Sequence, residues 1–355
     1  MQNRVSFGLI NTFGNPPAWR EPWAARYAGQ LEQIEWIDRD LPIDAIYVSE
    51  HHFYDDGYCP SPLLMGAAIA ARTTRLEIGT NLIQTPLHHP VRLAEEVLVL
   101  DALSGGRVRL GLGQGYFWQE FQGLGVPLNE RPSRTEEGIA ILRQAFEGKP
   151  FSFEGKRFTL PELTVTPPSI RDGGPEIWMG AFAPAAVERA ARIADGFLAF
   201  DISNADDYLA ACDALGKPLE ERRLNVTYWA IIAEDPERAF GQAGEHWLHL
   251  LNQYIVRDAY VGRQPSLTEP YADPRAALDD GLVMLADADG ALAEFNRMID
   301  KGCIDFNLVT HMPGEPVDQV SERLEYLSSA VIPNLRLSDH PALAARRARL
   351  DAFAS

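Results

Sequence analysis

The segment YVSEHHFYDDGYCP (47–60) places a glutamate and two histidines in a row at the predicted end of a buried strand. Glu50, His51 and His52 are followed by aromatic and acidic side chains and a glycine. Histidine changes its charge near neutral pH, so it can act as a general base or as a proton donor. Three kinds of site fit this pattern: a metal site, a proton-transfer site, and a site that activates a nucleophile.

A metal site needs several ligands around one ion, and the nearby imidazoles are His51, His52, His88 and His89. Neighbouring residues on a strand point to opposite faces, so an adjacent pair of histidines does not bring both rings to one ion. The chain contains no HxH, HExxH or CxxC motif. The pattern therefore favours proton transfer, with no metal, over a barrel metallohydrolase, which stays an alternative.

Two segments rich in small residues could each bind a ligand. In LGLGQGY (110–116) the glycines follow GxGxG, and Trp118 stands where the third glycine of a dinucleotide fingerprint belongs. Those glycines either relieve crowding inside the fold or leave room for a flat ligand. MGAFAPAAV (179–187) ends a strand and opens a helix, which suits either close packing or an anion at unpaired N–H groups.

The order of predicted elements supplies a scaffold that can bring these segments together. Strands are predicted at 5–12, 45–51, 76–83, 108–115, 176–182, 196–202, 224–232 and 303–311, with helical patterns between them. Eight such βα units predict an α/β fold, a closed (β/α)8 TIM barrel, and an open doubly wound sheet is the alternative. Catalytic groups of such barrels stand at the carboxyl ends of the strands, where His51, Asn81, Gln114 and 180–183 fall.

Apolar residues at helical spacing predict helices after most strands. Their ranges are 23–39, 61–73, 90–106, 133–148 and 184–195. Ser133 followed by Glu136 has the spacing of a capping box at the start of the fourth. The segment 151–160 predicts a hairpin that turns at Glu154–Gly155.

One long segment interrupts this alternation. Residues 251–286 join the seventh strand to the eighth and carry several prolines and tyrosines, including Tyr254, Tyr260 and Tyr271. Long connections inside compact domains are often lids, so we expect a mobile lid, with a static surface excursion as the alternative. We expect a single domain over 1–355, with a helical tail at about 335–355.

Composition excludes several classes of partner. Lys and Arg number 32 against 50 Asp and Glu, for a formal charge of −18, and no basic run is present, so nucleic acid is not expected. No apolar run approaches the roughly 20 residues that cross a bilayer, so no membrane partner is expected. The start, MQNRVSFGLINTFG, shows no secretory signal, and three cysteines without CxxC suit a reducing compartment. We expect a cytoplasmic location.

Three longer segments together resemble the bacterial luciferase-like flavin monooxygenases. They are SEHHF (49–53), IGTNLIQTPLHHPVRLAEEVLVLDALSGGRVRLGLGQG (78–115) and PEIWMGAFAPAAVERAARIADGF (175–197). The resemblance implies a barrel that binds reduced FMN, supplied by a separate flavin reductase in a transient encounter. It implies that this flavin reacts with dioxygen to a C4a-(hydro)peroxyflavin, which oxygenates a small apolar organic molecule.

The cofactor alternatives within this resemblance are FAD and a deazaflavin. A deazaflavin enzyme of the same fold would transfer hydride without using oxygen, but such proteins usually end the second strand differently from EHHF. A flavin-binding protein without catalytic activity is a further alternative. Light emission is not implied.

The resemblance also implies roles for individual residues. His51, the first histidine of EHHF, takes the catalytic role, and Asn81–Leu82 takes the place of a cis peptide bond without proline. His52 is then structural. The residues implied around the flavin are Asn81, Gln114, Tyr116, Gly180, Ala181, Phe182 and Ala183.

The sequence departs from bacterial luciferase where the flavin phosphate is bound. Gly113 and Gln114 stand in place of a cysteine and a phosphate-binding arginine. Ala181, Phe182 and Ala185 stand in place of a glutamate, a serine and a threonine. Loss of an Arg–phosphate pair removes a charge-assisted contact that is often bidentate. Only backbone N–H groups around Ala183 would remain.

The resemblance finally implies an assembly. In this family the faces of the helices that follow the second and third strands form a dimer. Here those helices are predicted at 61–73 and 90–103 and are rich in Leu, Ala and Val. We therefore expect a homodimer with Glu95 at or near its interface.

Overall fold

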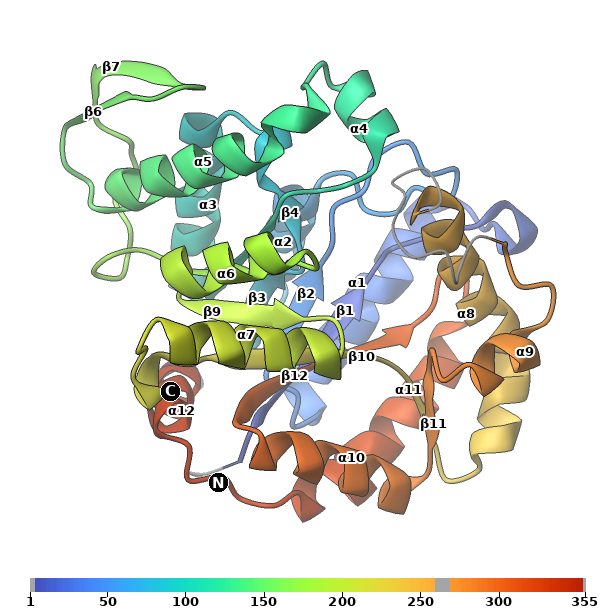
Figure 1. Ribbon diagram of the computed structural model, residues 1–355. Helices are drawn as coiled ribbons and strands as arrows, with labels where there is room; N and C mark the ends of the chain where they lie inside the picture. The colour runs from blue at the N-terminus through green and yellow to red at the C-terminus, as the bar shows by residue number, and fades with distance from the viewer. Residues whose placement is uncertain (1–3, 259–268, 354–355) are drawn as a thin grey trace.

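The computed structural model describes residues 4–258 and 269–353, and eight parallel strands close into a barrel (Figure 1). Around the barrel these strands are β1 (Ser6–Asn11), β2 (Ala45–Val48), β3 (Glu77–Thr80), β5 (Val108–Gly113), β8 (Glu176–Met179), β9 (Gly196–Ala199), β10 (Leu224–Ile232) and β12 (Cys303–His311). Pairing of β12 with β1 closes the barrel. The predicted TIM barrel is therefore confirmed, and the open sheet is wrong.

Helices cover the outside of the barrel (Figure 1). They are α1 (Trp23–Asp40), α2 (Pro62–Ala70), α3 (Pro90–Ser104), α4 (Trp118–Gly123), α5 (Arg131–Phe146), α6 (Pro184–Ile193), α7 (Ile202–Ala214), α8 (Pro236–Asp258), α9 (Pro274–Asp279), α10 (Ala288–Asp300), α11 (Val317–Tyr326) and α12 (Pro341–Phe353). Proline at the first position of α2, α3 and α6 costs no hydrogen bond, because N–H groups there have no partner within the helix. Within the described ranges, no helix is long and apolar enough to cross a membrane.

Short strands occupy the connections. β4 (Ile83–Gln84) pairs with β5, and β11 (Met284–Ala286) adds to β10. β6 (Phe151–Glu154) and β7 (Thr159–Leu163) form the predicted antiparallel hairpin, which stands at the upper left of Figure 1. The hairpin turns after Glu154, as the sequence indicated.

The start of the helix predicted at 133–148 is wrong. The helix begins at Arg131 because Pro132 fits its first turn, and Glu130 occupies the N-cap position. Ser133 therefore lies inside the helix, where its hydroxyl donates to the Glu130 carbonyl. Glu136 pairs with arginines of α6 instead of closing a capping box.

The segment expected to be a lid divides into several parts. Residues 251–258 complete α8, and α9 and β11 follow beyond it. Tyr254 is partly buried and packs against a hydrophobic cluster, whereas Tyr260 lies outside the described residues, as does all of 259–268. The first part is thus helix instead of loop, and the lid stays a prediction.

The barrel interior contains a balanced set of buried charges near the amino ends of the strands. Arg109 lies 3.1 Å from Glu77 and 3.2 Å from Asp305. Burial alone would lower the pKa of Arg109, but Asp305 and Glu77 raise it well above its ordinary value. Burial alone would raise the pKa of Asp305, but Arg109 and its neighbours hold it below its ordinary value.

Helix α12 supplies the remaining positive charges. Arg346 reaches Glu77 at 2.8 Å and Asp305 at 2.9 Å, and Arg349 reaches Glu77 at 2.5 Å and Glu176 at 2.7 Å. Figure 1 shows α12 at the lower left. The helix thus covers the amino-terminal end of the barrel, and its arginines neutralise the carboxylates there.

We predict that Arg346→Ala lowers the free energy of unfolding by about 3–5 kcal/mol, because it leaves two buried carboxylates short of a partner. Arg336→Ala is the matched control, since Arg336 pairs with Asp300 on the surface and its loss should cost about 1 kcal/mol or less. Urea unfolding of both variants measures the difference. Equal losses would show that α12 does not neutralise the interior.

Candidate active site

The loop after β2 is bound to the end of β3. Ser49 Oγ donates to the Asn81 carbonyl at 2.6 Å, and the Glu50 N–H donates to the Leu82 carbonyl at 3.0 Å. The Asn81–Leu82 peptide is cis, as expected from the sequence. The Asn81 amide also donates to Thr227 on β10 at 3.2 Å. The ends of β2 and β3 are therefore joined to each other, and Asn81 ties them to the middle of β10.

His51 lies in this loop and is 9% exposed. Its Nδ1 is 3.1 Å from the Glu120 Oε1 atom on α4. Four tyrosine rings surround the imidazole, with centroid distances of 4.9 Å for Tyr54, 4.8 Å for Tyr58, 6.4 Å for Tyr116 and 5.7 Å for Tyr254. The predicted catalytic histidine thus sits in a mainly aromatic enclosure with one carboxylate.

Glu120 is a site residue that the sequence pattern does not predict. Its side chain is fully buried, and its oxygens also accept from the His52 N–H at 2.7 Å and the Gln84 amide at 2.8 Å. A carboxylate at this depth needs such donors, because an unpaired buried charge is costly. The signal available was weak: one acidic residue shortly after the glycine-rich strand end, in a helix too short for periodicity.

His52 belongs to a different carboxylate. Its Nε2 is 3.1 Å from Glu50 Oε1, and His88 Nε2 is 2.7 Å from the same oxygen. Burial alone would raise the pKa of Glu50, but its hydrogen bonds with His52 and His88 hold that pKa at about 2. Burial alone would lower the pKa of His88, but Glu50 raises it. The adjacent histidines therefore have separate partners, which agrees with the expectation that their rings diverge.

Helix α8 closes one side of the His51 enclosure. The Tyr254 and Tyr58 hydroxyls are 2.9 Å apart, and Tyr58 also hydrogen-bonds Ser49. Burial raises the pKa of Tyr58 to about 12, so this hydroxyl stays neutral at ordinary pH. Near the same loop, Gln253 of α8 donates to the buried Asp56 at 3.0 Å. The helix thereby fixes the loop that carries His51.

The residues predicted around the flavin follow β5 and β8. Side chains added at Gly113 and Gly180 would meet the Leu82 methyl groups at 2.5 and 3.0 Å, so both glycines make room for Leu82. This observation supports the crowding interpretation of the glycines. Phe182 is 47% exposed and stacks on Phe200 at 4.7 Å.

A backbone contact fixes the end of β8. Asn204 of α7 donates to the Ala181 carbonyl at 2.7 Å. The segment Gly180–Ala183 carries no charged or hydroxyl side chain, and Ala183 is the N-cap of α6. A phosphate at this rim would meet backbone N–H groups and no cation from the segment itself.

Two buried amide atoms suit a planar heterocycle. Asn81 Oδ1 and Gln114 Nε2 have no hydrogen-bond partner among the described residues. One is an acceptor and the other a donor, and a flavin ring edge offers both kinds of group. Buried polar atoms are normally paired, so these two favour a polar ligand at this rim. Within the same ranges, no three His, Cys, Asp or Glu side chains are placed to hold a metal ion.

Comparison with known proteins places the chain in a family. The model of the luciferase-like monooxygenases matches residues 9–295. The chain belongs to the luciferase-like monooxygenase family. It is 27% identical over 272 residues to the 4-hydroxyprotoasukamycin monooxygenase of Streptomyces nodosus subsp. asukaensis, with 71% of each chain covered. It is 26% identical over 330 residues to the F420-dependent glucose-6-phosphate dehydrogenase of Rhodococcus erythropolis, covering 86% of this chain and 94% of the relative.

Among solved structures, the fold resembles the monooxygenase RslO1 of Streptomyces bottropensis. The TM-score is 0.79 at 23% identity, with 93% of this chain and 99% of the other covered. The luciferase-like family contains flavin monooxygenases and F420-dependent dehydrogenases, and its members use FMN or F420. The fold and the family are thus established at a level that includes both chemistries.

We predict that Glu50→Gln weakens the dependence of the free energy of unfolding on pH in the acid range. The pKa of Glu50 is about 2 in the folded protein against an ordinary 4.5, so its stabilisation is present above pH 4.5 and is lost as pH falls towards 2. As Glu50 becomes protonated, the free energy of unfolding of the natural protein should fall by on the order of 3 kcal/mol. The variant should lack this part of the fall, because it has no carboxylate at position 50. Glu237→Gln, which alters an exposed carboxylate, is the control. Urea titrations at several pH values decide; identical slopes for Glu50→Gln and the natural protein would contradict the assignment.

Proposed function

We propose that the protein is a reduced-flavin-dependent monooxygenase in which His51 acts as the general acid or base. The observation that carries the proposal is the His51 imidazole, held between a buried carboxylate and four tyrosines at the carboxyl ends of the strands. An aromatic, largely enclosed site suits a small apolar organic substrate. Dioxygen is the co-substrate, and a separate reductase supplies the flavin in a transient encounter.

The residues of the rim fit reduced FMN better on its ring side than on its phosphate side. Asn81 Oδ1 and Gln114 Nε2 would pair with the ring, and Gly180–Ala183 would meet the phosphate through backbone N–H groups only. When bound, reduced FMN supplies the electrons that let one atom of dioxygen enter an organic molecule. We expect weak binding of FMN, which suits a flavin that is exchanged with another protein.

The chain's own groups would control protons and water. With Nδ1 directed at Glu120, the Nε2 atom of His51 is left to take up or deliver a proton. The rings of Tyr58 and Tyr254 pack against the imidazole, and their hydroxyls hydrogen-bond each other. Such packing limits the water that would divert the reaction towards hydrogen peroxide.

A deazaflavin-dependent dehydrogenase is the second candidate. The F420-dependent relative matches over more of this chain than the monooxygenase relative does. The chain also lacks the side chains that bind the flavin phosphate in bacterial luciferase, which removes an argument for FMN. The EHHF ending of the second strand favours the monooxygenase.

Cofactor binding and isotope labelling separate these candidates. We predict that the protein binds reduced FMN more tightly than reduced F420 under anaerobic conditions. With a flavin reductase and ¹⁸O₂, a panel of apolar aromatic and aliphatic compounds should yield a product that gains one labelled oxygen atom by mass spectrometry. Tighter binding of F420, with hydride transfer and no label, would establish the dehydrogenase instead.

We predict that His51→Ala reduces product formation by about 10²-fold or more, the usual scale for loss of an acid–base group. Flavin affinity should change little, because the imidazole bonds Glu120 and packs among tyrosines. His52→Ala is the comparison, since His52 contacts Glu50 instead. If His52→Ala lowered product formation and His51→Ala did not, the catalytic histidine would be His52 and the proposal would be wrong.

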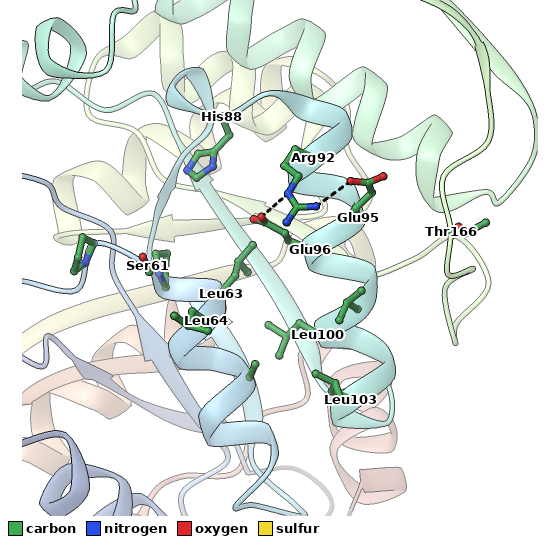
Figure 2. A pocket seen from close by; sticks show the side chains of 14 residues that line it. Ser61, Leu63, Leu64, His88, Arg92, Glu95, Glu96, Leu100, Leu103 and Thr166 are labelled. Carbon is green, nitrogen blue, oxygen red and sulfur yellow. Dashed lines mark hydrogen bonds and ion pairs between the residues drawn. The ribbon is translucent and has the colours of Figure 1, made fainter. Parts of the chain in front are cut away.

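We also propose that the protein is a homodimer. A groove of about 580 Å³ runs between α2 and α3 and is lined by Leu63, Leu64, Leu100 and Leu103, with Glu95 and Glu96 beside Arg92 along α3 (Figure 2). Leu64 is 74% exposed and Leu103 61% exposed. An apolar stripe of this kind supports an interface between two copies, with Glu95 at its edge.

Leu103→Lys should therefore shift the protein from dimer to monomer in sedimentation at micromolar concentration. The matched control is Leu215→Lys, because Leu215 is 52% exposed at the end of α7, away from α2 and α3. It should leave the mass unchanged. A clean monomer for the natural protein would refute the dimer.

A further inference from the structure

We infer that Glu120 is a positioning residue for the reaction: it holds His51 as the tautomer with the proton on Nδ1, which leaves Nε2 as the working nitrogen. The inference rests on the proposed function only for the role of His51. The placement of the proton follows from contacts of the protein alone.

The carboxylate determines which ring nitrogen carries hydrogen. An ionised carboxylate only accepts, so the nitrogen that faces it must donate. Glu120 Oε1 is 3.1 Å from His51 Nδ1. Among the described residues, none hydrogen-bonds Nε2. In the neutral ring the proton therefore lies on Nδ1, and Nε2 carries the lone pair.

Two donors fix the carboxylate independently of His51. The His52 backbone N–H donates to Oε1 at 2.7 Å, and the Gln84 side-chain amide donates to Oε2 at 2.8 Å. Gln84 is itself held, because its own N–H donates to Glu50 Oε2 at 2.6 Å. The orientation of the Glu120 carboxylate therefore does not depend on its contact with the imidazole.

The second buried carboxylate cannot replace Glu120. Glu50 receives hydrogen bonds from His52, His88 and the Gln84 N–H, and none of its contacts involves His51. The other titratable groups that face the ring are tyrosines: Tyr54 and Tyr58 on its own loop, Tyr116 after β5, and Tyr254 on α8. Glu120 is the acidic group in contact with His51 in the described part of the chain.

The expected effect on the reaction is large, because the wrong tautomer offers a hydrogen where a lone pair is needed. In hydrolases with a Ser–His–Asp triad, replacing the carboxylate that orients the histidine lowers kcat about 10⁴-fold. Here we expect Glu120→Ala to lower kcat by at least about 10²-fold with KM for the substrate nearly unchanged. Glu120→Asp, which keeps the carboxylate, should recover most of the rate.

The test is ¹⁵N NMR of histidine-labelled protein without flavin or substrate, with His51 signals assigned by their loss in His51→Ala. The natural protein and Glu120→Asp should show His51 protonated on Nδ1, and Glu120→Ala should show a mixture of tautomers. His52→Ala is the matched control: it removes the neighbouring ring, which bonds Glu50, and keeps the backbone N–H that donates to Glu120, so His51 should stay protonated on Nδ1.

Each outcome has one meaning. Unchanged His51 signals in folded Glu120→Ala, or a His51 ring protonated on Nε2 in the natural protein, would overturn the inference. If Glu120→Ala does not fold, the natural protein decides alone, because a His51 ring protonated on Nε2 would overturn the inference. If the tautomer is as stated but no oxygenated product forms, the proposed function fails and the positioning by Glu120 stands.

Discussion

Three arginines and three carboxylates share the interior of the barrel at its amino-terminal end, and the fold depends on their balance. Arg109 comes from β5, whereas Arg346 and Arg349 come from α12. Ions taken out of water are costly unless partners with good geometry repay the loss. Tyr47 completes this layer: its hydroxyl accepts from Arg109 at 2.8 Å, and its ring fills space that a side chain at Gly8 or Gly79 would occupy.

The opposite end of the barrel uses the same principle on a smaller scale. Two buried carboxylates each receive several donors, and Gln84 connects them. One carboxylate is bound to His51, while the other binds His52 and His88. Because His88 also lines the groove between α2 and α3, the outer surface and the proposed proton-transfer site share one hydrogen-bonded network.

The fold could be predicted because its signals are local. Each strand is a short buried run between turn residues, and Gly105, in the left-handed conformation at φ 68°, ends α3 where the sequence indicated. The position of His51 at a strand end followed from the same pattern. The absence of charged side chains in Gly180–Ala183 could also be read directly.

The partners of His51 could not be predicted, because they depend on distance in space. Glu120 lies on a six-residue helix, which is too short to show a periodicity. The contact of Tyr58 with Tyr254 joins residues 196 apart in the chain. The capping box predicted at Ser133 is wrong for a local reason, because Pro132 lies in the first turn of α5 and Glu130 takes the N-cap position.

The place of the neutralising arginines along the chain has a consequence for how the protein is made. Glu77 and Asp305 are synthesised before Arg346 and Arg349, so the ribosome releases the buried acids earlier than their counter-charges. Until α12 has emerged, the nascent barrel holds carboxylates that lack these partners. Glu77 and Asp305 therefore gain their full set of partners only once α12 is present, although every strand of the barrel precedes that helix in the chain.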